Sequence, residues 1–214
     1  GSSDARSVNK NGSSYCFSCN TYFPPEQTNI NEGDTMGIQA VQTKPIIIEN
    51  NAGTFSAIGD RCINEDTVKK YGVKVISDAS GTIDRHIYPY YDSTGSLLAT
   101  KTRYVKNKQF SIKGSTSDSG LFGQQLYNGG KYVTITEGEI DALSVYQLLG
   151  SKYAVVSIKN GVASALKDIK KSYDWLDQFD NIVINFDNDD VGREASKKVA
   201  ELFAPSKVKI LKLP

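Results

Sequence analysis

Three acidic side chains occupy positions from which they could together bind a metal ion. Glu137 directly follows the strand-like segment 132–136, and Asp187 and Asp189 follow a second such segment at 181–186. In open α/β sheets, ligands bind in the crevice beyond the carboxyl ends of the strands. The spacing therefore predicts that these three carboxylates converge at one edge of a sheet.

Carboxylates brought close together disfavour one another's charged form, and a bound cation removes that cost. Carboxylate oxygens select hard ions such as Mg²⁺ or Mn²⁺, and Mg²⁺ in proteins characteristically keeps several waters and binds substrate phosphates. Such a site suits phosphoryl or nucleotidyl transfer. The alternative is that the acids stabilise helix ends, with Asp189 or Asp190 as an N-cap and Glu139 and Asp141 in a first helical turn.

A regular alternation of strand-like and helix-like segments positions these acids. Three of the four strand segments are almost uninterrupted apolar runs, which is typical of strands buried on both faces. We predict an α/β fold across residues 131–214, with a parallel sheet and helices on both of its faces. The expected strands are 132–136, 154–158, 181–186 and 208–212, and the expected helices are 139–149, 163–172 and 190–203.

The preceding segment, residues 45–130, has the pattern of a small α+β subdomain. Its Tyr-, Val-, Ile- and Thr-rich stretches flank a turn, which favours a β-hairpin. A short helix is expected where Asn64 can act as an N-cap and Gly72 can follow the last turn. These elements are the helix 65–71 and the hairpin strands 85–91 and 97–105.

A basic stretch without acidic residues runs from Ser93 to Ser117. Interleaved basic and aromatic side chains suit a single-stranded nucleic acid, because the charges follow the phosphates and the rings stack on bases. Without an acidic metal site in the same chain, a solvated strand face would be the better interpretation. The side chains concerned are Lys101, Arg103, Lys106, Lys108 and Lys113, with Tyr104 and Phe110 among them.

A second candidate for phosphate binding is the tripeptide Lys159-Asn160-Gly161, between an expected strand and an expected helix. A glycine loop that leads into a helix can bind phosphate through backbone N–H groups. A plain strand–helix turn explains the tripeptide equally well. His86 is the only histidine, and we expect it to be a hydrogen-bonded strand residue rather than a catalytic one.

The first 44 residues differ in character from the rest of the chain. Residues 1–24 are rich in Gly and Ser and contain a CxxC motif formed by Cys16 and Cys19, whereas 25–44 have the composition of a linker. A structural zinc site needs four ligands, so this motif supplies half of one.

The overall composition excludes a membrane span and says little about partners. The 214 residues are 39% hydrophobic and carry a net charge of +1. No apolar run approaches the roughly 20 residues that a membrane-spanning helix needs. We therefore expect a cytoplasmic protein.

The stretches TEGEIDAL and FDNDDVGREA resemble the signature of Toprim domains, which has a glutamate after one strand and a DxD motif after a later one. A finer resemblance, including SYCFSC and LFGQQLYNGGKYVTITEGEIDAL, is to the primase half of the helicase–primase of T-seven-like short-tailed phages. It implies a partial zinc ribbon (1–24), a linker (25–44), and an RNA-polymerase domain with an α+β part (45–130) and a Toprim part (131–214). It also implies that the sequence is a fragment without the helicase domain.

The resemblance further implies an activity and a set of site residues. The activity is DNA-dependent synthesis of short RNA primers, a nucleotidyl transfer in DNA replication. Its partners would be single-stranded DNA, ribonucleoside triphosphates, a helicase domain in the same polypeptide and a DNA polymerase. In these terms Glu137, Asp187 and Asp189 are catalytic Mg²⁺ ligands, Arg103, Lys106, Lys108, Lys159, Asn160 and Gly161 bind nucleotide or template, and Cys16 and Cys19 bind Zn²⁺ in the intact protein.

Two other functions are compatible with the same residues. One is a non-catalytic module that binds single-stranded DNA for a replicative helicase, in which case the acids would have no catalytic role. The other is a Toprim nuclease, which would cut DNA with Mg²⁺ and would not use nucleotides. The CxxC motif and the basic hairpin favour the primase.

Overall fold

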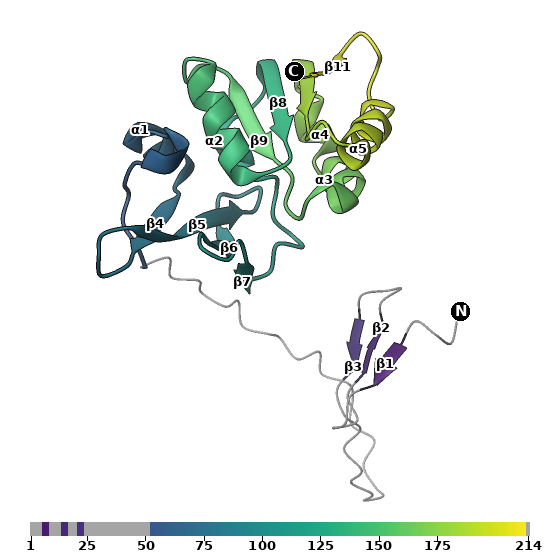
Figure 1. Cartoon of the computed structure of the whole chain (residues 1–214). Coiled ribbons are helices and arrows are strands. Elements are labelled where there is room, and N and C mark those ends of the chain that lie inside the picture. Colours follow the sequence, from purple (N-terminus) through teal and green to yellow (C-terminus); the bar gives the residue numbers. More distant parts are fainter. Residues whose placement is uncertain (1–5, 9–13, 17–20, 24–51, 213–214) are drawn as a thin grey trace, which may run out of the picture. The chain divides into compact units, whose positions relative to one another are not determined.

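The computed structural model describes residues 6–8, 14–16, 21–23 and 52–212, and the chain divides into two compact units, 1–44 and 45–214 (Figure 1). The first unit contains an antiparallel sheet in the order β1-β2-β3. The Cys16 side chain and the whole of Cys19 lie outside the described residues, as does the predicted linker. The strands of this unit are β1 (Arg6–Val8), β2 (Ser14–Cys16) and β3 (Thr21–Phe23).

The second unit begins with an α+β part whose four strands form an antiparallel sheet in the order β4-β5-β6-β7. The predicted helix and hairpin are present. Asn64 accepts a hydrogen bond from the Thr67 N–H (2.8 Å), and Gly72 ends the helix in the left-handed conformation. The elements are η2 (Gly59–Arg61), α1 (Glu65–Tyr71), β4 (Lys74–Ser77), β5 (Ile83–Tyr91), β6 (Leu97–Tyr104) and β7 (Phe110–Gly114).

The rest of the second unit is the α/β part, with a four-stranded sheet in the order β11-β10-β8-β9. Every strand pairing in this sheet is parallel, which confirms the predicted fold class. The strands are β8 (Gly130–Thr136), β9 (Ala154–Ser157), β10 (Phe179–Asn185) and β11 (Val208–Ile210). The helices are η3 (Gln124–Leu126), α2 (Glu139–Leu148), η4 (Val162–Ser164), α3 (Ala165–Lys171), α4 (Tyr173–Leu176) and α5 (Asp190–Ala200).

Helices cover both faces of the parallel sheet, with α2 on one side and α3, α4 and α5 on the other (Figure 1). The alternation of side chains along β9 shows how the core is divided. Val155 packs with α2 and the α+β part, whereas its neighbour Val156 packs with α3 and α5. No described helix is long and apolar enough to cross a membrane.

The two parts of the second unit share a hydrophobic core, which fixes one against the other. Tyr71 of α1 is fully buried, and its hydroxyl donates to the Val155 carbonyl oxygen of β9 (2.9 Å). Phe122, in the segment that joins the two parts, forms a β-bridge with Ser157 and stacks on the Tyr71 ring. The side chains of β5 and β6 are therefore held at fixed positions beside the parallel sheet.

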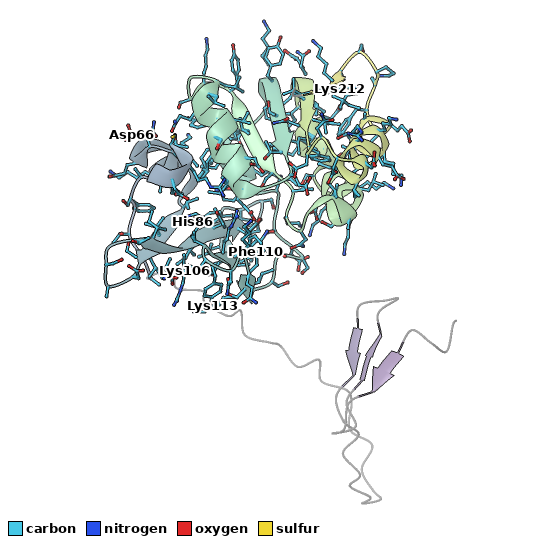
Figure 2. The ribbon with its side chains drawn as sticks, in the orientation of Figure 1. Asp66, His86, Lys106, Phe110, Lys113 and Lys212 are labelled. Atoms are coloured by element: carbon cyan, nitrogen blue, oxygen red, sulfur yellow. The ribbon has the colours of Figure 1, made fainter. Side chains whose placement is uncertain are left out.

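His86 of β5 is buried, and its Nε2 atom has no hydrogen-bond partner; its Nδ1 atom lies 3.1 Å from the Tyr88 hydroxyl (Figure 2). The expectation of a fully hydrogen-bonded histidine is therefore wrong for one ring nitrogen. Burial, followed by the positive charge of Arg103 on the paired position of β6, lowers the pKa of His86. Of the two charged residues of η2, Asp60 raises the pKa of His86 and Arg61 lowers it.

This burial predicts a pH dependence of stability. The folded chain resists protonation of His86, whereas in the unfolded chain the imidazole titrates near pH 6.5. As the pH falls below about 6.5, the unfolded chain gains the proton first, and the free energy of unfolding decreases by at most about 1.4 kcal/mol per pH unit from this group. Urea unfolding of the wild type and of His86→Phe between pH 7.5 and 5.5 isolates the effect. Parallel pH profiles of the two proteins would contradict it.

Candidate active site

The acidic residues lie where the order of the parallel strands changes direction along the chain. From β8 the chain crosses to β9 on one side and then returns to β10 on the other, so that the loops after β8 and β10 diverge. A crevice at such a switch point is the usual ligand site of open α/β sheets. Thr136 and Asn185 are paired at the ends of β8 and β10, which brings Glu137 and Asp187 together. The Asp187 N–H faces the Glu137 carboxylate at 3.5 Å (N to Oε2).

Negative charge accumulates at this crevice. Desolvation, followed by the charge of Asp187, raises the pKa of the half-buried Glu137, and Asp189 and Asp141 add to the effect. A carboxylate whose charged form is disfavoured by its neighbours is stabilised by a cation. The electrostatics therefore agree with the chemistry that the sequence predicts for these acids.

Asp189 is the N-cap of α5 and accepts a hydrogen bond from the Gly192 N–H at 2.7 Å on Oδ1. The capping alternative raised by the sequence is thus correct for Asp189. It does not exclude metal binding, because an ionised carboxylate has about four acceptor sites and this side chain is exposed. Capping also fixes the loop that carries Asp187.

Two glycines allow the acidic loops to pack closely. A Cβ atom on Gly192 would lie 2.1 Å from the Asp187 carbonyl oxygen, and a Cβ atom on Gly138 would lie 2.7 Å from Asp141 Oδ2. Real Cβ atoms essentially never approach other atoms this closely. Gly192 therefore requires glycine for the observed loop conformation, because the clash there is with backbone, whereas at Gly138 the Asp141 carboxylate can rotate away.

The donor set fits an open Mg²⁺ or Mn²⁺ site. In the part of the chain that the structure describes, no three His, Cys, Asp or Glu side chains enclose a metal position. Mg²⁺, however, is characteristically bound through one or two protein carboxylates, with waters and substrate phosphates as the other ligands. Glu137 and Asp187 can supply two carboxylates, and their oxygen atoms suit hard ions.

Glu139 and Lys101 form a buried ion pair that the sequence analysis did not assign to the site. Lys101 Nζ lies 2.8 Å from Glu139 Oε1, and the two side chains are only 12% and 6% exposed. The Tyr90 hydroxyl donates to the same carboxylate oxygen at 2.5 Å. Burial and the Glu139 charge raise the pKa of Tyr90 well above its usual value, so that it remains a donor. The ExE spacing was the signal in the sequence, since it places a second acid two residues after Glu137.

The loop Lys159-Asn160-Gly161 lies beside the acids, but its lysine does not face a ligand. A Cβ atom on Gly161 would be 4.0 Å from Glu137 Oε1, and Asn160 is exposed. Lys159, in contrast, is 4% exposed, and its ammonium donates to two backbone carbonyl oxygens and pairs with Asp168. The predicted contact of the Lys159 side chain with nucleotide is therefore not supported by its position.

Lys101, Arg103 and Phe110 of the basic stretch share one face of β6 and β7, where cross-strand pairing joins charges to an aromatic ring, whereas Lys113 lies on the opposite face. Arg103 pairs with Phe110, and both Arg103 and Lys101 lie over the Phe110 ring, with Lys101 Nζ 4.7 Å from its centroid. Phe110 is 51% exposed, and the neighbouring Ile112 is also exposed. Lys101 of this face also pairs with Glu139, two residues after Glu137. This face therefore extends from the acidic loop to solvent.

Lys106 and Lys108 lie on the turn between β6 and β7. Lys106 forms an exposed ion pair with Asp78 (3.4 Å), and Lys108 is exposed in the left-handed backbone conformation. Figure 2 shows Lys106, Phe110 and Lys113 on the same subdomain. An exposed ion pair contributes little, so that Lys106 remains available to a phosphate.

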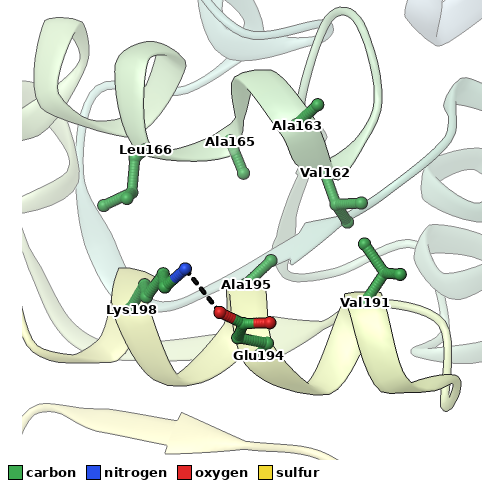
Figure 3. A pocket seen from close by; sticks show the side chains of 8 residues that line it. All are labelled: Val162, Ala163, Ala165, Leu166, Val191, Glu194, Ala195 and Lys198. Atoms are coloured by element: carbon green, nitrogen blue, oxygen red, sulfur yellow. Dashed lines mark ion pairs between the residues drawn. The ribbon is translucent and has the colours of Figure 1, made fainter.

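A shallow groove of about 190 Å³ borders the crevice between the η4–α3 segment and α5 (Figure 3). Val162 directly follows Gly161, and Val191 follows Asp190, so the groove begins where the loops of the site end. Apart from the Glu194–Lys198 ion pair (2.6 Å), its lining is apolar. Metal or phosphate ligands must therefore come from the loops and not from this groove.

Comparisons with known proteins agree with this architecture. A family described as Toprim-like matches residues 134–214, and a family described as bacteriophage T7 DNA helicase/primase, N-terminal a+b fold, matches residues 53–114. The boundary between these matches falls between the two sheets of the second unit. The parallel sheet with acids at its switch point is thus a Toprim-type fold.

Related proteins show to which family with this Toprim-type fold the chain belongs. A DNA helicase/primase of Enterobacteria phage T3 is 34% identical over 222 aligned positions, which cover 100% of this chain and 38% of that protein. The crystal structure of the primase fragment of the bacteriophage T7 primase-helicase is 33% identical, with a TM-score of 0.68, and the match covers 100% of this chain and 87% of that one. The chain belongs to the phage DNA helicase/primase family.

A third match is the structure of the bacteriophage T7 lagging-strand DNA polymerase interacting with primase domains bound to an RNA/DNA hybrid and dTTP. The matched chain is 38% identical with a TM-score of 0.68, and the alignment covers 76% of this chain and 81% of that one. The chain spans little more than a third of the phage T3 relative.

The close approach of α5 to the acidic loop gives a prediction for Gly192→Ala. Alanine normally stabilises a helix interior by about 1 kcal/mol relative to glycine. Here the added Cβ atom would collide with the Asp187 carbonyl group, so we expect the free energy of unfolding to fall by about 1–3 kcal/mol. Urea unfolding measures this change. Gly59→Ala is the matched control, because a Cβ atom there meets nothing within 4 Å; equal stability of the two variants would contradict the prediction.

Proposed function

We propose that the chain is the catalytic part of a DNA primase, a nucleotidyltransferase that makes short RNA primers on single-stranded DNA. The observation that carries this proposal is the junction of two surfaces of opposite charge. Glu137 and Asp187 meet at the switch point of the Toprim sheet, and Lys101 of the basic and aromatic face pairs with Glu139, two residues after Glu137. Nucleotidyl transfer on a template needs both a metal site and a surface for a polyanion.

The roles follow from the positions. Glu137, Asp187 and Asp189 hold Mg²⁺ or Mn²⁺, which when bound neutralises the charge of the triphosphate and orients the attacking hydroxyl. Arg103 lies over the Phe110 ring on the same face as Lys101, where it can contact a nucleotide phosphate, and Phe110 offers a ring for stacking. Asn160 and Gly161 offer backbone N–H groups next to Glu137, and Lys106 and Lys108 contact the template backbone.

The remaining assignments extend the same proposal. Residues 1–24 belong to a zinc ribbon in which Cys16 and Cys19 are ligands of Zn²⁺, 25–44 form a linker, and 45–130 and 131–214 are the two subdomains of the polymerase domain. The partners are ribonucleoside triphosphates, a helicase domain in the same polypeptide and a replicative DNA polymerase. The polymerase is supported by the T7 primase domains that interact with one. We place the protein in the cytoplasm of the host cell.

Primer synthesis tests the proposal directly. With Mg²⁺, mixed-sequence single-stranded DNA and labelled ribonucleoside triphosphates, we expect short RNA products. Asp187→Ala removes a metal ligand and should lower the rate at least about 100-fold. Asp190→Ala is the matched control, since this neighbouring acid is exposed and pairs with Arg193.

Two results would favour the other functions over the primase. Binding of single-stranded DNA without any RNA product would indicate a non-catalytic module. Cleavage of the DNA that depends on Mg²⁺ and ignores nucleotides would indicate a nuclease. Full activity of Asp187→Ala would contradict the metal site.

The exposed ring of Phe110 predicts a stacking contact with the template. Stacking of a base on an aromatic ring contributes about 1–3 kcal/mol, so Phe110→Ala should weaken binding of a fluorescent oligonucleotide at least about fivefold. Fluorescence anisotropy measures the affinity. Phe55→Ala is the control, because Phe55 is also exposed and also lies beside a lysine, but outside the basic face. An equal effect of both substitutions would refute the contact.

A further inference from the structure

The Lys159 ammonium is the buried centre of a cluster that connects three segments. It donates to the Thr116 and Ser119 carbonyl oxygens at 3.0 and 3.1 Å and lies 3.5 Å from Asp168 Oδ1. Thr116 and Ser119 belong to the segment between β7 and η3, which joins the α+β part to the Toprim part. The lysine thus ties this joining segment (residues 115–120) to α3.

Asp168 holds the other side of the cluster. Its Oδ2 atom accepts hydrogen bonds from the Lys159 N–H (3.0 Å) and from the Ser164 hydroxyl (3.2 Å). The carboxylate therefore fixes the loop from Lys159 to Ser164 at both ends. Gly161, in the middle of that loop, is the residue beside Glu137.

The backbone of Lys159 continues the connection towards the acids. Its carbonyl oxygen accepts a hydrogen bond from Lys101 Nζ (2.8 Å), and the same ammonium pairs with Glu139. A continuous series of polar contacts therefore runs from Asp168 through Lys159 and Lys101 to Glu139. It crosses from the Toprim part to β6, the strand that carries Arg103.

The energetics indicate a positional role for this pair rather than a stabilising one. Taking two charges out of water costs several kcal/mol per ion, and a well-packed apolar pair is often as stable or more stable. Burial lowers the pKa of Lys159 in spite of the nearby Asp168 charge, which shows that the desolvation cost is not fully offset. What an ion pair supplies and an apolar pair does not is directed hydrogen bonds to particular carbonyl oxygens.

We propose that Lys159, paired with Asp168, is a positioning residue. It holds the joining segment 115–120 and the Gly161 loop in fixed positions relative to each other, so that the carboxylates and the basic face form one site. The importance of this restraint for catalysis rests on the proposed function. The restraint itself, of residues 115–120 by a lysine of the Toprim part, can be tested without measuring catalysis.

The test uses Lys159→Met/Asp168→Leu, which removes both charges and leaves no unpaired buried ion. Hydrogen exchange of the backbone amides of residues 116–120, followed by mass spectrometry, should become roughly tenfold faster or more as the segment opens locally. Lys171→Met is the matched control, because Lys171 donates to the Ser117 carbonyl oxygen and pairs with Asp118 of the same segment but is largely exposed. Its exchange should equal that of the wild type.

A second readout reports on the acidic crevice. Mn²⁺ titration followed by electron paramagnetic resonance should show roughly tenfold weaker binding in the double variant, as expected when a group that orients a ligand is lost. Glu137→Gln defines the binding that depends on the site. If the wild type shows no such binding, the metal site of the proposed function fails, whereas the exchange experiment still decides the role of Lys159.

Unchanged exchange of residues 116–120 in the double variant would overturn the proposal. A lower melting temperature together with unchanged exchange and unchanged Mn²⁺ affinity would show a merely structural pair and would overturn it as well. Faster exchange in the double variant but not in Lys171→Met, accompanied by weaker Mn²⁺ binding that depends on Glu137, would establish the positioning role.

Discussion

The ion pair between Lys101 and Glu139 is the interaction on which the geometry of the candidate site depends. It joins β6 of the α+β part to the first turn of α2, directly after the loop that carries Glu137. Because Tyr90 donates to the same carboxylate, two groups from two neighbouring strands, β5 and β6, fix a single oxygen atom of Glu139. If this contact were lost, the shared core would still hold the two parts together, but Lys101 would no longer link the basic face to the first turn of α2.

The near-zero net charge of the chain conceals a strong separation of charge. The acids gather at the carboxyl edge of the parallel sheet, whereas the lysines and arginines of the basic stretch lie on β6, β7 and the turn between them. Opposite charges at this junction partly neutralise one another in the absence of ligands. A polyanion attracted to the basic face brings its phosphates to the acidic edge, where they need a divalent cation in order to stay.

The sequence was sufficient for the features that depend on local pattern. The four parallel strands, the capped helix α1 and the β5–β6 hairpin follow from periodicity and turn residues, and the proximity of Glu137 and Asp187 follows from strand order. The edge strands β4 and β7 were missed because they are short, at four and five residues. β7 is also exposed at every position.

The role of Lys159 could not be predicted for a different reason. Its partners are backbone carbonyl oxygens about 40 residues earlier in the chain. Every residue has such an oxygen, so the amino-acid types give no indication of which ones Lys159 contacts. Lys101 was visible as one of several basic residues, but only the tertiary structure distinguishes it from Lys106, which lies at the surface. Burial of a charge is a property of the fold. The sequence pattern favoured exposed, ligand-binding roles for Lys101 and Lys159, and in the structure both are buried in ion pairs.

The order of the parallel strands also has a consequence for folding. Glu137 and Asp187 are separated by 50 residues, and β9, which pairs with the other edge of β8, lies between β8 and β10 in the sequence. Closing a loop of this length costs roughly 3–4 kcal/mol of chain entropy, which late contacts must offset. A nascent chain that ends before β10 has Glu137 and the basic face but no acidic crevice. A cation bound between Glu137 and Asp187 would therefore stabilise only those molecules in which β10 has paired with β8.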